Sequence, residues 1–271
     1  MPKISFSTVG LIDKPIEEVI ELAAAWGFSG IDLCVSPRGH VRHDTSAEQL
    51  ERIRRRALSH AVQISSLYGY GGRGLLGGAV GVDQANIRSE FSIATRLGAN
   101  RLRVFAGHEG EAPEHLGDFA NSLRPLCEAA LREGLLIIIP THNDLAGDAG
   151  RATAMFERLG QDAVRLIFNS ATLELAGMDP LAQLDACWPM IDRLEIKDFQ
   201  IDRSGRAIPV PLGEGQASLD AVLAAALGRG FDGWMTVHYL RNLFPEAEDA
   251  LTALPKSRSY LQRLLAPALN A

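Results

Sequence analysis

The chain has 271 residues, of which 46% are hydrophobic and 22% charged, and its formal net charge is −6 at pH 7. These values fit a globular protein of one large or two small domains, and the acidic balance argues against a surface for nucleic acids or anionic membranes. The N-terminus lacks a signal-peptide pattern, and no apolar stretch approaches the ~18–20 residues of a membrane span. We therefore expect a cytoplasmic protein. Three cysteines without CxxC spacing indicate neither a disulfide framework nor a thiolate zinc site.

Eight short apolar runs follow one another along the chain and are typical of strands covered on both faces. They are Lys3–Val9, Gly30–Ser36, Val62–Tyr68, Arg101–Gly107, Leu135–Pro140, Val164–Asn169, Arg193–Asp198 and Trp234–His238. Helical patterns lie between them, such as Pro15–Phe28, Ser46–Ala61 and Ser218–Phe231.

Single residues mark the expected helix ends. Pro15 suits a first helical turn, Ser46 and Ser218 suit N-caps, and Gly134 and Gly230 suit the turn after a helix. The regular alternation predicts an α/β fold, a single (β/α)8 TIM barrel that spans residues 1–271 as one domain. A doubly wound sheet is the alternative, but neither GxGxxG nor GxxxxGK[ST] follows the first apolar run.

Polar side chains stand at the ends of the predicted strands, where the active sites of parallel barrels are found. They include Tyr68, His108, His142, Asn169, Glu195, Lys197, Asp198 and His238. The glycine-rich segment Tyr68–Gly81 also predicts a mobile lid or a backbone cradle for anions with Arg73 as its anchor, or else a plain flexible loop.

The last third of the chain resembles the xylose-isomerase-like barrels. The matching pieces are the pair Lys197–Asp198, the turn Pro211–Gln216 and the segment Gly230–Val237, while "RLRVFAG" and "THND" agree in type and position. That group contains sugar and sugar-phosphate isomerases and epimerases, inositol-pathway dehydratases and enzymes of the endonuclease IV type. The resemblance covers essentially the whole chain and implies the barrel fold; the group is functionally mixed, so it implies no single activity.

The resemblance also implies a metal site, from which this chain departs. Members that act on sugars typically bind one divalent cation through Glu, Asp, His and Glu at four successive strand ends. The corresponding positions here hold Pro140, Asn169, Glu195 and His238. One carboxylate remains where the family has three, so a site for Mg²⁺ or Mn²⁺ should be badly weakened. We expect no cofactor, although a weak or softer divalent site (Zn²⁺, Mn²⁺ or Co²⁺) on Glu195, His238 and His142 is left open.

Glu195 and His238 should meet, because the seventh and eighth strands of a barrel are neighbours. A carboxylate beside an imidazole orients the ring and keeps it basic, which suits a general base or acid. Lys197 could stabilise an enolate or form a Schiff base, and His142 could bind a substrate hydroxyl or carboxylate. The alternatives without a catalytic role are a structural Glu195–Lys197 ion pair and an Asp198 that only fixes its loop.

We therefore predict a sugar isomerase/epimerase-like enzyme that acts on a small polyhydroxylated or carbonyl compound by proton transfer, without the divalent metal. The alternatives are a non-catalytic binder of a sugar-like ligand or partner subunit, and a lyase of the dehydratase or decarboxylase type. The predicted catalytic residues are Glu195, His238 and Lys197. The predicted substrate-binding residues are His142, Asn169, Tyr68, His108, Asp198 and Arg73. The expected partner is a small sugar-like molecule, with no nucleic acid or membrane, and a homo-oligomer is left open.

Overall fold

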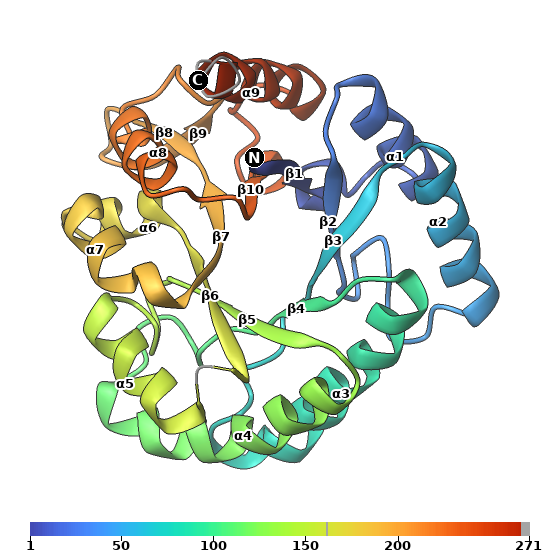
Figure 1. Ribbon diagram of the computed structural model, residues 1–271, viewed down its shortest axis with the longest axis vertical. Coiled ribbons are helices and arrows are strands. Elements are labelled where there is room, and N and C mark those ends of the chain that lie inside the picture. The colour runs from blue at the N-terminus through green and yellow to red at the C-terminus, as the bar shows by residue number, and fades with distance from the viewer. Residues whose placement is uncertain (161, 267–271) are drawn as a thin grey trace.

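The structure is a computed structural model that describes residues 1–160 and 162–266. Eight parallel strands close into a barrel (Figure 1). In chain order they are β1 (Lys3–Ser7), β2 (Gly30–Cys34), β3 (Gln63–Tyr68), β4 (Arg101–Arg103), β5 (Leu136–Pro140), β6 (Val164–Phe168), β7 (Ile191–Ile196) and β10 (Trp234–Val237). Each overlaps a predicted run, so the (β/α)8 barrel is confirmed and the doubly wound alternative is wrong. The last residues of the predicted domain, 267–271, lie outside the described part.

Helices form a ring around the barrel (Figure 1). They are α1 (Ile16–Ala25), α2 (Ala47–Ser59), α3 (Val80–Leu97), α4 (Leu116–Arg132), α5 (Ala149–Leu159), α6 (Ser170–Leu175), α7 (Pro180–Cys187), α8 (Leu219–Gly228) and α9 (Ala250–Leu265). Short 3-10 helices join them at η1 (Thr8–Leu11), η2 (Gly77–Ala79), η3 (Pro113–His115), η4 (Trp188–Met190) and η5 (Arg241–Leu243). Within the described ranges, every helix is too short or too polar for a membrane span.

The helix ends follow the sequence in most places. Ser46 caps α2 through a reciprocal capping box with Gln49, and Gly134 takes the left-handed backbone conformation (φ 72°) that glycine permits after a helix. Ser218 does occupy the N-cap position of α8, but its side chain does not cap the helix. Its hydroxyl instead donates to Glu174 at 2.9 Å, which ties the start of α8 to α6. The predicted side-chain cap at Ser218 is therefore wrong.

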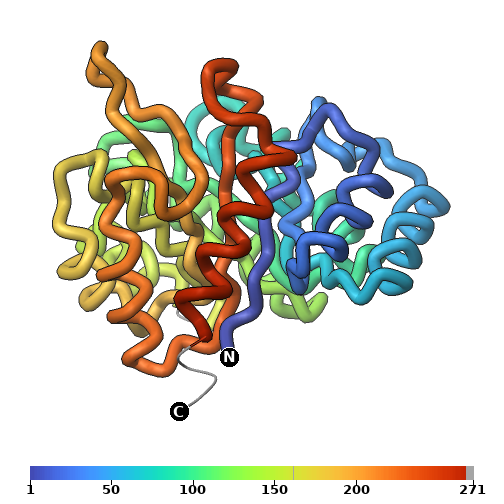
Figure 2. The backbone as a smooth tube through the Cα atoms, turned by 90° about the horizontal axis from the view of Figure 1, so that it is seen from above, coloured from blue at the N-terminus to red at the C-terminus, as the bar shows by residue number. Residues whose placement is uncertain are grey.

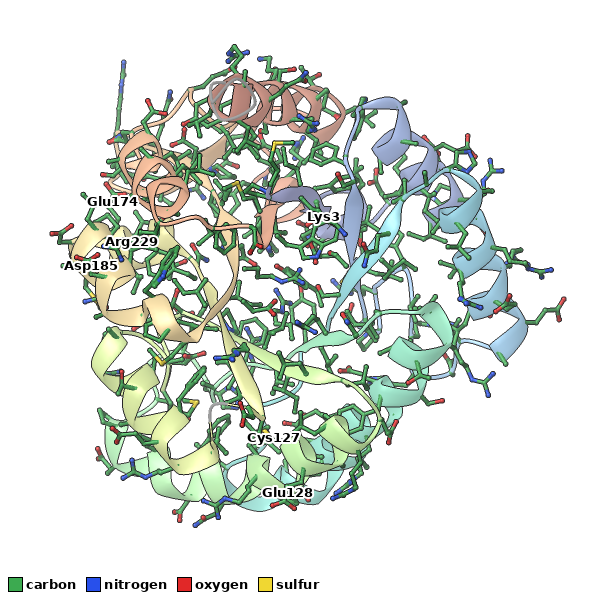
Figure 3. All side chains as sticks on the ribbon, in the orientation of Figure 1. Lys3, Cys127, Glu128, Glu174, Asp185 and Arg229 are labelled. Carbon is green, nitrogen blue, oxygen red and sulfur yellow. The ribbon has the colours of Figure 1, made fainter. Side chains whose placement is uncertain are left out.

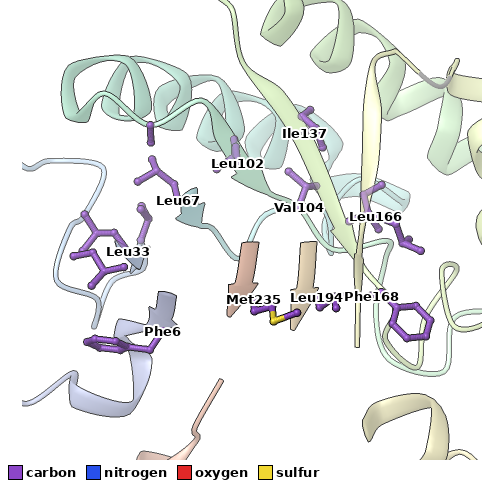
Figure 4. Packing of buried hydrophobic residues seen from close by; sticks show 14 of the residues in the cluster. Phe6, Leu33, Leu67, Leu102, Val104, Ile137, Leu166, Phe168, Leu194 and Met235 are labelled. Carbon is purple, nitrogen blue, oxygen red and sulfur yellow. The ribbon is translucent and has the colours of Figure 1, made fainter. Parts of the chain in front are cut away.

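The apolar core lies between the strands and the helices, not inside the barrel. Alternate strand residues such as Leu33, Leu67 and Leu166 point outward into it (Figure 4). Each such fully buried side chain contributes about 1.5–3 kcal/mol. Inside the barrel, side chains fill the centre (Figure 3), and a separate apolar cluster is formed by Tyr68, Ile138 and Ile167. The three cysteines are buried free thiols, in agreement with the sequence.

A two-stranded hairpin, β8 (Asp198–Ile201) and β9 (Ala207–Val210), was not predicted. It projects from the end of the barrel opposite the N-terminus (Figure 2). Its turn is built by Asp202, whose carboxylate accepts from the backbone N–H groups of Ser204 and Arg206. The hairpin therefore rises at the edge where β7 ends, beside the predicted site.

Candidate active site

The lower part of the barrel interior holds a polar network that we call the floor network: Ser5, Asp32, Ser65, Ser66 and Arg193. The side chains of Asp32 and Arg193 are both fully buried and form an ion pair. They come from β2 and β7, which are not neighbours, so the pair crosses the interior of the barrel. The Asp32 carboxylate also accepts from the hydroxyls of Ser5 (2.6 Å), Ser65 (2.6 Å) and Ser66. The polar side-chain atoms of this network have hydrogen-bond or ion-pair partners among the described residues.

A second group, the mouth cluster, lies nearer the carboxyl end of the strands and consists of Asn169, Glu195, Lys197 and His238. Glu195 Oε1 lies 3.0 Å from Lys197 Nζ and accepts from Asn169 Nδ2 at 2.9 Å. Glu195 Oε2 lies 3.0 Å from His238 Nδ1. That contact is short enough for a hydrogen bond, but its angle is poor, so neither atom has a well-formed partner. The expected meeting of Glu195 and His238 is confirmed; their catalytic roles stay predictions.

Strand register explains why these residues meet. β6, β7 and β10 are adjacent, and their carboxyl ends share one edge of the barrel. Glu195 is paired with Thr236, and His238 follows two residues later on the same side of the strand. The His238 backbone N–H donates to the Ile196 carbonyl at 3.0 Å, which continues the pairing beyond β10. The imidazole is thereby fixed above the floor network.

Asn169 presents its amide N–H to Glu195, because its oxygen is engaged elsewhere. Asn169 Oδ1 accepts from the Thr172 backbone N–H at 3.2 Å and so caps α6. The sequence therefore uses one residue both to start a helix and to donate to the carboxylate.

The charge states in the mouth cluster are set by burial and by close cations. Burial alone would raise the pKa of Glu195, but His238 and Lys197 outweigh it and hold that pKa well below its ordinary value. Burial lowers the pKa of His238 below 6.5, with Glu195 opposing and Lys197 reinforcing the change. These shifts favour a Glu195 carboxylate and a neutral His238 imidazole near neutral pH.

Aromatic rings cover the cluster from the opposite strands. Tyr68 of β3 stacks on His238 with 5.8 Å between ring centroids, and its hydroxyl is buried without a partner among the described residues. Phe105 meets His142 edge to face at 5.5 Å. Burial, reinforced by Lys197, lowers the pKa of His142, so this half-buried imidazole is also neutral near pH 7. His142 therefore lies at the rim of the mouth, whereas Tyr68 is buried inside the barrel against His238.

The family model for the xylose isomerase-like TIM barrel matches residues 20–262. The chain belongs to this family. Among proteins of curated function, none matches it.

Solved structures share the fold at low sequence identity. The probable 3-DHS dehydratase AsbF of petrobactin synthesis from Bacillus anthracis is 17% identical, with a TM-score of 0.79, and the match covers 96% of this chain and 98% of that one. D-psicose 3-epimerase from Clostridium cellulolyticum H10, solved with D-tagatose, is 10% identical, with a TM-score of 0.80 and coverages of 97% and 98%. A family member from Mycobacterium smegmatis in complex with magnesium is 18% identical, with a TM-score of 0.77 and coverages of 99% and 97%. At these identities the likeness shows the fold alone.

The residues present do not fit the divalent metal that sugar-converting members of the family hold. Pro140 offers no side-chain donor, and Asn169 turns its N–H, not its oxygen, toward Glu195. The Lys197 ammonium group already lies against the one carboxylate. In residues 1–160 and 162–266, no group of three or more His, Cys, Asp or Glu side chains is arranged to hold a metal ion. We derive no step through a metal.

Two predicted substrate-binding residues are not brought into the cluster. His108 is exposed in the loop after β4. Asp198 is buried, and its carboxylate accepts from the backbone N–H groups of Gly213 (2.9 Å), Gly215 (2.9 Å) and Ala217 (3.2 Å). The geometry thus gives Asp198 the alternative role of fixing its loop.

Sequence reasoning missed Arg103, which is buried at the end of β4. Its guanidinium carbon lies 4.2 Å from the ring centroid of Tyr68 and 4.9 Å from that of Tyr70. An arginine in the middle of a predicted strand was the available signal, because an unpaired cation seldom occupies such a position without a function.

Proposed function

We propose that the protein is an enzyme that transfers protons on a small polyhydroxylated or carbonyl compound, as sugar isomerases and epimerases do, and that it needs no divalent metal. The observation that carries this proposal is the Glu195 carboxylate held between the Lys197 ammonium group and the His238 imidazole at the barrel mouth. A base, a cation and an orienting carboxylate are the groups needed to remove and return a proton next to a carbonyl.

In this proposal His238 is the base. Its neutral imidazole takes a proton from a carbon next to the substrate carbonyl, and Glu195 beside Nδ1 stabilises the imidazolium ion that forms. The other ring nitrogen, Nε2, is then the atom that faces the substrate. Return of the proton from the imidazolium ion to the neighbouring carbon gives an isomer, whereas an epimer requires a second proton donor on the opposite face of the same carbon, a role open to Lys197.

Lys197 supplies the positive charge for the enolate oxygen that develops as the proton leaves. Its side chain retains 20% of its exposure, so a substrate can reach it. Lys197 Nζ lies 3.0 Å from Glu195 Oε1 as its ion-pair partner, which suits enolate stabilisation better than nucleophilic attack to form a Schiff base.

A dehydratase-type lyase is the second candidate. It begins with the same proton abstraction and then expels a neighbouring hydroxyl group, which requires an acid beside the leaving oxygen. The His238 imidazolium ion that forms in the first step is the acid that this site can supply to that oxygen. The fold shared with a probable dehydratase is compatible with this reaction but does not select it.

The test is proton exchange with solvent. The chelator-treated protein is incubated in D₂O with a panel of ketoses, aldoses and keto acids, and deuterium at the carbon next to the carbonyl is followed by NMR. Exchange is expected with the wild type and not with His238→Asn, while His115→Asn, which changes an exposed histidine of η3, serves as the matched control. An epimerase reaches one mixture from either epimer, whereas a lyase consumes its substrate. Absence of exchange with every compound would favour the non-catalytic binder.

A further inference from the structure

We propose that the mouth binds an anionic group of its substrate, a carboxylate or a phosphate, between Arg73 and Arg103 and against the ring of Phe105. This inference rests on the proposed function only for the position of the reacting carbon. The anion site itself is argued from the arginines and their surroundings.

Arg103 is a buried cation whose charge is not matched by a close carboxylate. It is 3% exposed, yet no Asp or Glu oxygen of the described residues lies within 4.0 Å of its guanidinium group. Nε and Nη2 both donate to the Gly69 carbonyl at 3.2 Å, which leaves Nη1 for another acceptor. The rings of Tyr68, Tyr70 and Phe105 offset part of the cost of burying this charge. A buried charge is normally paired, so an anion is the expected missing partner.

Arg73 brings a second positive charge to the same ring. Its guanidinium carbon lies 4.3 Å from the Phe105 centroid, and that of Arg103 lies 4.7 Å from it. Arg73 is half-buried in the glycine-rich segment after β3, and in the described part of the chain no carboxylate lies within 4.0 Å of it either. Two like charges on one ring repel each other, and an anion between them would remove that repulsion.

The nearby carboxylates are committed to other partners. Glu195 pairs with Lys197, and Glu90 lies 3.0 Å from His43. Burial raises the pKa of Glu90, and its Oε2 has no hydrogen-bond partner among the described residues. Burial also raises the pKa of Asp144 to about 6, and its oxygens accept from the backbone N–H groups of Ala106 (3.3 Å) and Ala146 (2.9 Å). In the described part of the chain, Arg73 and Arg103 thus have no carboxylate within 4.0 Å around Phe105, while each nearby carboxylate has another close partner.

The position of this charge relates the anion to the proposed chemistry. Arg103 lies over the ring of Tyr68, and the same ring stacks on His238. An anion held by Arg73 and Arg103 is thus one aromatic ring away from the proposed base. Guanidinium groups make strong charge-assisted hydrogen bonds to carboxylates and phosphates, so one bond from Arg103 Nη1 together with bonds from Arg73 would fit a sugar acid or a sugar phosphate better than a neutral sugar.

The test measures binding, which does not depend on turnover. Calorimetric titrations of the wild-type protein use D-gluconate, D-glucose 6-phosphate and D-glucose, with inorganic phosphate as the smallest probe. We expect at least one of the anions to bind and D-glucose to bind at least about 10-fold more weakly. Arg73→Met should weaken anion binding about 10- to 100-fold, because it removes charge-assisted hydrogen bonds from a half-exposed side chain. Arg52→Met, an exposed arginine of α2, is the matched control.

The outcomes separate the two proposals. Binding of D-gluconate without phosphate binding would assign a carboxylate substrate, and the reverse would assign a phosphate. Anion binding without proton exchange in D₂O would overturn the proposed function and leave the anion site standing. Binding of D-glucose as tight as that of the anions, no anion binding, or anion binding unchanged in a folded Arg73→Met variant would overturn the anion site.

Discussion

The barrel interior contains two buried ionic groups in consecutive layers, and they differ in how completely they are satisfied. In the floor network, the Asp32 carboxylate accepts from three serine hydroxyls and pairs with Arg193. In the mouth cluster, Glu195 Oε2 and His238 Nδ1 face each other at a poor angle, and the Tyr68 hydroxyl near them has no partner in the described residues.

This difference separates a structural role from a chemical one. A buried polar network that is fully hydrogen-bonded rigidifies a fold. A network with unused donors and acceptors can instead form hydrogen bonds to a ligand. Arg193 and Glu195 lie two residues apart on β7, so one strand serves both layers. The floor network holds β7 in place, and the mouth cluster presents its reactive groups from the same strand.

The largest effect is expected from Glu195→Gln. It keeps the shape of the side chain but removes the charge that faces Lys197 and His238. We expect kcat to fall by about 10²- to 10⁴-fold, the usual contribution of general acid–base catalysis, with an unchanged circular dichroism spectrum. Glu174→Gln, on the outer ring of helices (Figure 3), is the matched control. Retained turnover in Glu195→Gln would place the chemistry elsewhere.

Substitutions in the floor network should instead lower the free energy of unfolding. Arg193→Met leaves the Asp32 carboxylate buried without its cation, and breaking such a pair costs about 3–5 kcal/mol. Urea denaturation measures this loss. The double variant Asp32→Leu/Arg193→Met should recover part of it, because no uncompensated charge remains. A single Arg193→Met variant as stable as the wild type would show that the pair is not what holds the layer together.

The strands were predictable because each is an apolar run of the right length between helical patterns. The contact between Glu195 and His238 followed from the order of strands in a barrel. The pairing of Asp32 with Arg193 did not, since the two residues are far apart in sequence and on strands that are not neighbours. Their meeting depends on the stagger of the strands, which hydrophobic patterns do not reveal. The same holds for Arg103, whose aromatic surroundings come from three separate positions.

Strand β3 carries a hydroxyl group in each layer, Ser66 in the floor network and Tyr68 beside the mouth cluster. The two layers can therefore be compared within one strand. Ser66 donates to Asp32, so Ser66→Ala should cost about 1–3 kcal/mol of stability. The Tyr68 hydroxyl has no partner in the part of the chain described, so Tyr68→Phe should change stability by less than about 1 kcal/mol while the ring stays on His238. Thermal unfolding of both variants measures the difference. Equal losses would mean that Tyr68 has a partner in solution and that the layers are alike.

The smallest expected effect is a shift in the titration of His238, followed by NMR on the histidine-labelled protein. Burial lowers the pKa of His238 below 6.5, and Lys197 lowers it further, so removal of this cation in Lys197→Met should raise it. Lys256→Met, on the exposed face of α9, should leave it unchanged.

The lowered pKa of His238 also determines whether the stability of the protein rises or falls with pH. The folded state binds the His238 proton less tightly than the unfolded chain does, so this residue destabilises the protein as the pH falls below 6.5. Lys197→Met should weaken that dependence, because its folded-state pKa lies closer to the unfolded value. A wild-type pKa above about 7 would mean that Glu195 outweighs burial, and His238 would then enter the reaction as an acid at neutral pH instead of as a base.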